Sequence, residues 1–197
     1  MKKIGITGGI GSGKTTVCKI FETLHIPIYY ADDRAKWLMV NDLALVKNIK
    51  NIFGEDAYLP DNTLNRKYIS DIVFQNQAKL TALNELVHPA VFEDGEKWFA
   101  AQKNAPYTLK EAALLVESNS YKQLDALIVV TAPLETRIER VMLRDKAKKE
   151  EVEARIAKQL PEDEKLKYAD FVIVNDGKKL LLPQVMAIHS EILSSGF

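Results

Sequence analysis

The sequence predicts an α/β fold in which helices flank a parallel sheet of five strands. Short runs rich in isoleucine and valine alternate along the chain with segments of helical periodicity. Such uninterrupted apolar runs are typical of parallel strands that helices cover on both faces. A glycine-rich loop, "TGGIGSGKTT" at residues 7–16, directly follows the first apolar run. We therefore expect the first strand to lead straight into a functional loop.

Five segments are expected to form the strands, because each is short and dominated by aliphatic residues. They are residues 3–7, 28–31, 107–116, 126–131 and 171–175. The helical segments lie between these runs and after the last of them. They are residues 14–24, 33–53, 66–102, 134–166 and 180–193.

Local signals divide or end two of the helical segments. Asn41-Asp42 predicts a break in the segment after the second strand, and Gly54 is a suitable residue to end it. His88-Pro89 predicts an interruption of the long segment before the third strand. Proline restricts the residue before it and lacks an N–H donor, so a helix is expected to break there.

A chain of 197 residues is expected to fold as one compact domain with a full core. The helical stretch between the second and third strands is too long for a simple crossover, so we expect an inserted helical subdomain at about residues 33–105. It would lie over the strand ends, where open α/β sheets bind their ligands. The charged helices at about residues 140–165 are expected to form a lid.

Composition argues against several classes of protein. Lys+Arg and Asp+Glu both number 27, so net charge gives no reason to expect nucleic acid or an anionic membrane as a partner. No stretch approaches the ~20 apolar residues of a membrane span, and the start of the chain is unlike a signal peptide. Cys18 is the only cysteine, which excludes an internal disulfide and favours a buried, unreactive thiol. We therefore expect a cytoplasmic protein with no protein partner indicated.

The loop matches the pattern Gly8-x-x-x-x-Gly13-Lys14-Thr15 in its expected context, after a strand and before a helix. Glycines let backbone N–H groups surround phosphate oxygens, and the helix N-terminus adds partial positive charge. Lys14 is expected to reach the β- and γ-phosphates, and the Thr15 hydroxyl to bind Mg²⁺. The pattern favours a bound nucleotide over a glycine-rich turn without a ligand, and it predicts a P-loop NTPase fold.

Two further features indicate a small-molecule kinase. The sequence has no guanine-recognition motif of the Asn-Lys-x-Asp type, since Asn175-Asp176-Gly177 lacks the lysine. The helical insert and the basic helices after the fourth strand would supply an acceptor pocket and a lid that excludes water.

Two adjacent carboxylates, Asp32 and Asp33, follow the second strand where a helix is expected to begin. One of them can cap the helix, and one can accept or orient the proton of an acceptor hydroxyl. Asp33 suits the cap and Asp32 suits the pocket, but spacing alone does not decide between them.

Arg140 and Arg144 stand four residues apart in "ERVMLRD", on one face of the expected helix. On an arbitrary helix such arginines are solvated and pair with acids. After the fourth strand of this fold, however, they can swing over transferring phosphates. Arg155 and Gln159 are expected to form a second such pair on the next helix.

A series of motifs, in order and separation, gives the sequence an end-to-end resemblance to the dephospho-CoA kinase family. The motifs are "GITGGIGSGKTTV", "ADDRA", "IFG", "TLNRKYISDIVF", "LNELVHPAV", "LLVES", "RVMLRD", "RIAKQ" and "ADFVIVNDG". Members transfer the γ-phosphate of ATP to the ribose 3′-hydroxyl of dephospho-CoA, the last step of coenzyme A biosynthesis, with Mg²⁺. The resemblance implies ATP and dephospho-CoA as substrates and a fold like that of nucleoside monophosphate kinases.

The resemblance also implies roles for the residues that match these motifs. Asp32 takes the position of the catalytic aspartate, which accepts or orients the 3′-hydroxyl proton, and Lys14 and Arg140 join it in the catalytic set. The residues implied to bind ATP are Gly8, Gly9, Gly11, Ser12, Gly13, Lys14, Thr15, Thr16, Arg144 and Asn175. Those implied to bind the acceptor are Asp32, Arg66, His88 and Glu117. A His-Pro helix break explains His88 nearly as well.

Two positions depart from the pattern of the family. Tyr30 stands where the family has an aspartate, and Ala113 stands where it has a proline. Neither departure removes a group from the implied chemistry. They leave open whether Glu111 contributes to the Mg²⁺ site through water.

Two other functions stay open at this point. Another kinase of this fold, such as a nucleoside monophosphate kinase, would share the loop and lid and differ in its acceptor pocket. A nucleotide-binding regulator that has lost catalysis finds support only in Tyr30 and Ala113, and it is opposed by the intact Lys14, Thr15 and Asp32.

Overall fold

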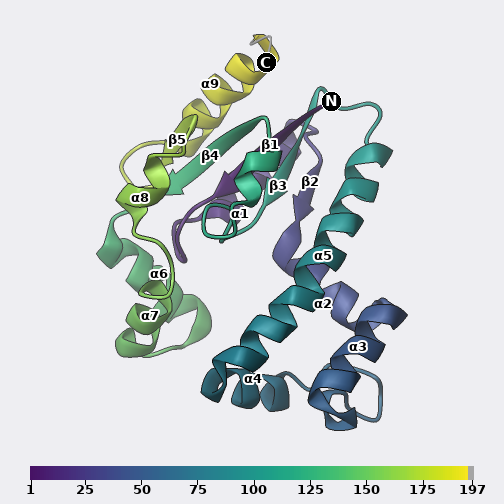
Figure 1. The fold of residues 1–197 in the computed structure, drawn as a ribbon. Coiled ribbons are helices and arrows are strands. Elements are labelled where there is room, and N and C mark those ends of the chain that lie inside the picture. The colour runs from purple at the N-terminus through teal and green to yellow at the C-terminus, as the bar shows by residue number, and fades with distance from the viewer. Residues whose placement is uncertain (195–197) are drawn as a thin grey trace. The chain divides into compact units, whose positions relative to one another are not determined.

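The computed structural model describes residues 1–194, and the chain divides into two compact units. The first unit comprises Met1–Tyr30 and Gln102–Phe197, and the second comprises Ala31–Ala101. The strands of the described residues all belong to the first unit, where they form one parallel sheet (Figure 1). The second unit is helical.

The first unit is a sheet with helices packed on it. Its strands are β1 (Lys2–Thr7), β2 (Ile28–Tyr30), β3 (Tyr107–Glu111), β4 (Ala126–Thr131) and β5 (Phe171–Val174). They lie in the order β2-β3-β1-β4-β5, and each neighbouring pair is parallel. The helices are α1 (Lys14–Thr23), α6 (Leu134–Asp145), α7 (Lys149–Ile156), α8 (Glu162–Leu166) and α9 (Leu181–Ser194), with a 3₁₀ turn, η2, at Ser120–Gln123. The prediction of a five-stranded parallel sheet is confirmed.

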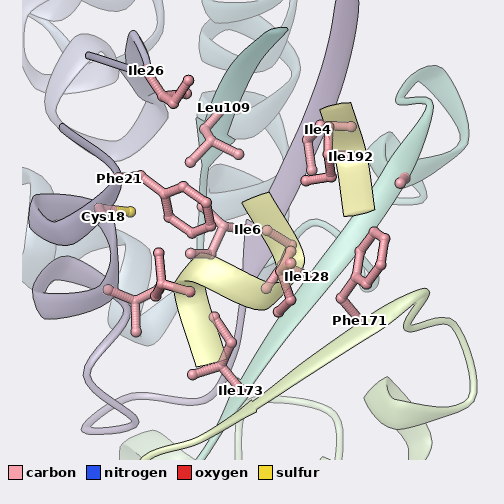
Figure 2. Close-up of a cluster of buried hydrophobic side chains, with 14 of the residues drawn as sticks. Ile4, Ile6, Cys18, Phe21, Ile26, Leu109, Ile128, Phe171, Ile173 and Ile192 are labelled. Carbon is pink, nitrogen blue, oxygen red and sulfur yellow. The ribbon is translucent and has the colours of Figure 1, made fainter. Parts of the chain in front are cut away.

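Alternate residues of the strands face two different apolar layers, as the period of two in a strand requires. Ile4 and Ile6 of β1 point into the cluster of Figure 2, which helices α1 and α9 cover. Leu127 and Val129 of β4 face the other layer, which the segment after β3 and the end of α8 cover. Cys18 is fully buried in the first cluster, and burial raises the pKa of its thiol. The expectation of a buried thiol is therefore confirmed.

The second unit consists of four helices around a core of its own. The elements are α2 (Ala31–Asn41), α3 (Leu43–Phe53), α4 (Arg66–Gln75) and α5 (Gln77–Ala101), with a 3₁₀ turn, η1, at Glu55–Ala57. The long helix α5 packs against α2, α3 and α4. Its core includes Leu38, Ile49, Phe53, Ile69 and Val87. Over the described residues, no helix combines the length and the apolar character needed to cross a membrane.

Both tryptophans of the chain lie in this second unit. The guanidinium of Arg34 lies 4.3 Å from the ring centroid of Trp37 and forms a two-pronged pair with Asp94, at 2.6 and 2.8 Å. Trp98 of α5 meets Phe99 edge to face, with ring centroids 5.4 Å apart. All of these contacts lie within the unit, and the Arg34–Asp94 pair connects α2 to α5.

The helix break at Asn41-Asp42 is confirmed, and so is the end at Gly54. The Asp42 carboxylate caps α3 by accepting the N–H groups of Ala44 and Leu45, at 2.9 and 3.0 Å. Gly54 ends α3 with a φ of 88°, a conformation that glycine adopts without strain. Both signals are local backbone chemistry, which explains why they could be identified in the sequence.

The expected break at His88-Pro89 is wrong, because Pro89 lies inside α5. The exposed proline removes one hydrogen bond, and the packing of neighbours such as Val87 keeps the chain helical there. The interruption occurs instead at Asn76, between α4 and α5. Its side chain accepts the N–H of Lys79 at 3.1 Å, the hydrogen bond of a helix cap.

Further boundaries differ from the prediction, and the helical segment expected at residues 134–166 is divided into α6, α7 and α8. Strand β3 ends at Glu111, because the chain then turns, with Ser118 N–H donating to the carbonyl of Leu114. The apolar residues that follow enter the second layer without belonging to a strand. Helix α7 ends at Ile156, so Gln159 lies beyond it and the expected helical pair with Arg155 is wrong.

Candidate active site

The loop between β1 and α1 is shaped by its glycines. Gly11 and Gly13 have φ values of 80° and 93°, in the left-handed region that a side chain disfavours. A Cβ on Gly11 would also collide with the carbonyl of Arg137, and one on Gly13 with the side-chain amide of Asn175. The loop therefore requires glycine for its backbone conformation and for the close approach of its neighbours.

Helix α1 begins at Lys14 directly after this loop. The N–H groups of Thr16 and Val17 donate to the carbonyl of Gly13, at 3.0 and 3.2 Å. Those of Lys14 and Thr15 precede this first helical hydrogen bond. Backbone donors in this position, together with the helix dipole, favour an anion such as phosphate.

The side chain of Lys14 lies back over the loop toward the end of β3. Its Nζ donates to the carbonyl of Gly8 at 2.9 Å and lies 4.0 Å from Glu111 Oε1. Both side chains are about one-tenth exposed, at 11% and 10%. Lys14 and Glu111 thus place a cation and a carboxylate beside the loop, largely sheltered from solvent.

The residues expected at a Mg²⁺ site have suitable chemistry for that ion. Thr15 is exposed in the first turn of α1, and the carboxylate of Glu111 ends β3. Within residues 1–194, no group of three or more His, Cys, Asp or Glu side chains could hold a metal by protein ligands alone. Mg²⁺ usually takes only one or two protein oxygens and completes its shell with water and substrate phosphates, so this donor set fits it.

Arg140 of α6 is held beside the loop by Asn175. Its Nη2 donates to the backbone and side-chain oxygens of Asn175, at 3.1 and 3.3 Å. The Asn175 amide in turn donates to the carbonyl of Ser12 in the loop, at 2.8 Å. Arg140 Nη1 is buried and finds no hydrogen-bond partner among the described residues. One end of the guanidinium is therefore fixed and the other has donors to spare for a ligand.

Arg144 lies one turn further along α6 and has a different environment. Its side chain is 62% exposed and pairs with Asp145 at 2.7 Å. Asp145 also pairs with Arg155 of α7, at 2.9 Å. The hydrogen bond from Arg144 lowers the pKa of the Asp145 carboxyl. The structure therefore brings Arg140 to the loop, whereas Arg144 belongs to an exposed cluster between α6 and α7.

Arg137, one turn before Arg140, is buried against the loop. Its Nε donates to the carbonyl of Ile10 at 3.0 Å, and its Nη1 pairs with Glu162 of α8 at 3.1 Å. Burial raises the pKa of the Glu162 carboxyl, and the Arg137 charge opposes that effect. From the segment after α7, Gln159 Oε1 accepts the N–H of Ile10 at 2.8 Å.

Glu117 joins the segment after β3 to the segment around α8. Its Oε1 lies 2.6 Å from Lys165 Nζ and accepts the N–H of Leu160 at 3.1 Å. Lys165 is 1% exposed and also donates to the carbonyl of Ala113 at 3.2 Å. Glu117 Oε2 is buried and has no partner within residues 1–194. Glu117 therefore links the two segments through Oε1, and its Oε2 keeps the capacity to accept a hydrogen bond.

Helix α2 of the second unit begins at Ala31, which changes the interpretation of the two adjacent carboxylates. Both Asp32 and Asp33 lie in its first turn and are exposed. Asp33 is therefore not the helix cap, and its carboxylate instead pairs with Lys36, one turn on, at 2.6 Å. Negative charge in this turn still complements the helix dipole.

Of the other residues expected at the acceptor side, Glu117 is partly buried, whereas the two in the second unit are exposed. Arg66 opens α4 after its cap Asn65, and His88 lies within α5 beside Pro89. Because the helix does not break at this proline, a His-Pro break no longer accounts for His88. The described structure offers these side chains to solvent in their own unit.

A family model described as dephospho-CoA kinase matches residues 2–180. Curated dephospho-CoA kinases support the match over nearly whole chains. One from Bacteroides fragilis is 35% identical over 94% of this chain and 90% of its own length. One from Aquifex aeolicus is 36% identical over 98% of each. The chain belongs to the dephospho-CoA kinase family.

Solved structures agree with this membership. A crystal structure of a Thermus thermophilus protein is 33% identical, with a TM-score of 0.87 over 98% of both chains. Dephospho-CoA kinase from Campylobacter jejuni is 27% identical, with a TM-score of 0.72 over 99% of this chain and 98% of that one. A shikimate kinase from Acinetobacter baumannii, at 16% identity and a TM-score of 0.52, shares the fold alone. The P-loop kinase fold is thereby established.

Tyr30 and Ala113 are the two positions that depart from the pattern of the family, and the structure shows which contacts each residue makes. Tyr30, at the end of β2, donates its hydroxyl to Glu22 of α1 at 3.0 Å, and burial raises the pKa of that hydroxyl. Ala113 contributes its carbonyl, which accepts from Thr7 and Lys165, both at 3.2 Å. Neither side chain takes a place among the loop residues described above.

Three site neighbours were not predicted from the sequence, namely Arg137, Glu162 and Lys165, and Gln159 was expected only in a helical pair with Arg155. A signal for Arg137 was available, because Arg137, Arg140 and Arg144 recur at helical spacing on one face of α6. Its pairing with Glu162 spans 25 residues, and the pairing of Lys165 with Glu117 spans 48. Pairings of that kind depend on tertiary structure and leave no local pattern.

Proposed function

We propose that this chain transfers the γ-phosphate of ATP to the ribose 3′-hydroxyl of dephospho-CoA, giving CoA and ADP. The observation that carries this proposal is the match to the dephospho-CoA kinase family over residues 2–180. Curated relatives of that name align over at least 90% of their own length. The chain therefore has room for the ATP site and for the acceptor unit that this reaction requires. ATP is its phosphate donor, and we place the reaction in the cytoplasm, where ATP is supplied.

The loop and its neighbours form the ATP end of the proposed site. Backbone N–H groups of the loop beyond Ile10 surround the phosphates, and Lys14 moves from the Gly8 carbonyl to the β- and γ-phosphates. Thr15 holds Mg²⁺, with Glu111 contributing through water. When bound, that ion neutralises charge that builds on the phosphate oxygens.

Arg140 acts on the group in transfer. The spare Nη1 donors hydrogen-bond the γ-phosphoryl oxygens, while Asn175 holds the other end of the guanidinium. Arg144 and Asn175 complete the proposed ATP-binding set. Because Arg144 is exposed, its contribution to ATP affinity is smaller than that of Lys14.

Asp32 acts on the acceptor in this proposal. The 3′-oxygen forms a bond to the γ-phosphorus as the bond from that phosphorus to the β,γ-bridging oxygen breaks. The 3′-hydroxyl proton passes to the Asp32 carboxylate, and the electron pair of the broken bond leaves with ADP. Arg66, His88 and Glu117 bind the acceptor.

The proposal is tested by following ADP release with dephospho-CoA, AMP, CMP and adenosine offered separately. We expect turnover with dephospho-CoA to exceed that with each of the others by at least an order of magnitude. A preference for AMP or CMP would reject dephospho-CoA as the acceptor, while the conclusion that the chain is a kinase would stand. ADP release that no acceptor stimulates would reject transfer altogether.

A further inference from the structure

Ile10, at the tip of the phosphate loop, is held by hydrogen bonds at both its N–H group and its carbonyl. Ile10 donates its N–H to Gln159 Oε1 at 2.8 Å and accepts at its carbonyl from Arg137 Nε at 3.0 Å. Its side chain packs on the apolar cluster of α6 and α7, around Ile138, Val141 and Val152. Main chain and side chain therefore both fix the position of this residue.

Of the two hydrogen bonds made by Ile10, the one from Arg137 has the larger energetic cost, because it requires a charged guanidinium to be buried. Its side chain is 7% exposed, and arginine is almost never this buried unless it is paired. The pair is Glu162, at 3.1 Å, on α8. The guanidinium also lies against Gly9, where any Cβ would collide with it. Arg137 thus contacts two successive loop residues and α8 at once.

The segment that receives these contacts is itself anchored. We call residues 157–166 the anchor segment, because it contains Gln159, Leu160, Glu162 and Lys165. Leu160 N–H and Lys165 Nζ both bind Glu117 Oε1, at 3.1 and 2.6 Å. Through Glu117 the anchor segment is tied to the chain that follows β3, and through Arg137 and Gln159 it is tied to the loop.

We propose that Arg137 is a positioning residue for ATP, which holds the tip of the phosphate loop against the anchor segment so that the N–H groups beyond Ile10 converge on the phosphates. The proposal rests on the proposed function only in naming ATP as the ligand. Ile10 spends its own N–H on Gln159, so the phosphate donors are those of the residues that follow it. Their direction depends on where Ile10 is fixed.

The shape of the arginine side chain explains why it suits this position. A guanidinium can donate from Nε and from Nη1 in one plane, and so it reaches the Ile10 carbonyl and the Glu162 carboxylate together. A lysine ammonium at this position would keep the charge but could not span both partners with the same geometry.

The first test is the affinity for ATP with no acceptor present, measured by calorimetric titration. Arg137→Ala is expected to weaken ATP binding about tenfold or more, by analogy with the outer-shell partners of metal ligands, whose removal typically costs about 10–100-fold. Arg137→Lys is expected to fall between Arg137→Ala and the unaltered chain. In steady-state kinetics, kcat should fall and the KM for ATP should rise, while the KM for dephospho-CoA should stay within about twofold of its value in the unaltered chain.

A matched pair on α8 serves as the control. Glu162→Gln removes the charge that holds Arg137 and is expected to weaken ATP binding about threefold. Glu164→Gln removes an exposed pair with Lys167 on the same helix and is expected to leave ATP binding unchanged. Thermal unfolding of each variant without nucleotide shows which variants are folded at the temperature of the titration.

Each result bears on the proposal. If folded Arg137→Ala or Arg137→Lys binds ATP within twofold of the unaltered chain, the proposal is overturned. The same holds if Glu162→Gln and Glu164→Gln are equivalent. Should Arg137→Ala not fold, the Arg137→Lys and Glu162→Gln titrations decide. Failure of the unaltered chain to phosphorylate dephospho-CoA would reject the proposed function and leave the ATP titrations intact as a test.

Discussion

In the first unit Lys14 and Arg137 are only 11% and 7% exposed and are hydrogen-bonded to the phosphate loop, whereas in the second unit Asp32, Arg66 and His88 are exposed. The loop glycines are fixed by their neighbours, and Lys14, Arg137 and Arg140 each bond a main-chain carbonyl. A site of the first kind is organised before its ligand arrives. A site with exposed side chains must immobilise them when the ligand binds, which costs about 0.5–1.5 kcal/mol of binding free energy for each side chain.

This contrast suggests how the two substrates are handled. The ATP end has its electrostatics arranged in advance, which is the condition for stabilising charge that develops during transfer. In the proposed function, the acceptor end contributes exposed groups, and we expect these to gain their positions when the acceptor binds. Substitutions in the first unit should therefore reduce catalysis through many coupled contacts, and those in the second through single side chains.

Lys14→Ala should produce the largest loss. It removes the cation expected at the β- and γ-phosphates, so we expect kcat to fall by about 10³-fold or more and ATP binding to weaken. The melting temperature should change little, because the substitution leaves the backbone of α1 as it is. Steady-state kinetics and calorimetry measure the two effects. Near-normal turnover in a folded variant would remove the loop from the mechanism.

Asp32→Asn should produce the next largest loss and tests the exposed side of the comparison. The change keeps size and removes the charge that accepts a proton, so kcat should fall by about 10²-fold, the low end for a general base. Asp33→Asn is the matched control. Asp33 pairs only across one exposed turn with Lys36, so kcat should stay within about twofold. The reverse pattern would assign the catalytic role to Asp33.

Arg140→Ala should lower kcat by about 10–10²-fold while raising the KM for dephospho-CoA much less, because the charge developing on the γ-phosphoryl is its target. Arg144→Ala, on the same helix and exposed, should change kcat by no more than about threefold. The pair is compared by full kinetics with both substrates varied. If Arg140→Ala raises only the KM for dephospho-CoA, Arg140 binds the acceptor.

Pro89→Ala should have the smallest effect on turnover and tests the second unit alone. The proline lies exposed within α5, where it removes a helix hydrogen bond. Replacing it should raise the free energy of unfolding by about 1–3 kcal/mol, because alanine restores the N–H donor and favours the helix. Urea denaturation followed by circular dichroism measures the change. A loss of stability would contradict this expectation and show that the proline itself stabilises the unit.

The parts of the fold that could be predicted are those fixed by local chemistry. Lys14, Thr15 and the glycines give a phosphate loop by spacing alone, and Asp42 caps α3 through its own side chain. Pro89 was misjudged because packing along α5 outweighs the local preference of proline. Asp33 was misjudged because the helix begins two residues before it, at Ala31.

The parts of the candidate site that could not be predicted are those made by distant partners. Arg140 was singled out from its motif, but the hydrogen bonds that it donates to Asn175 join two segments 35 residues apart. Arg137 resembles any charged residue of a surface helix until Glu162 and Ile10 are placed beside it. Tertiary contacts of this kind decide which arginine of a helix face is buried and which, like Arg144, is solvated.

The location of Trp37 and Trp98, both in the helical unit, gives the chain a built-in optical reporter. Tryptophan emission responds to its immediate surroundings, and here those surroundings are α2 and α5. The phosphate loop and the rest of the sheet unit contribute no indole of their own. A fluorescence titration without any added label therefore registers what happens to the helical unit, and a change on adding ATP alone would mean that nucleotide bound in one unit is sensed in the other.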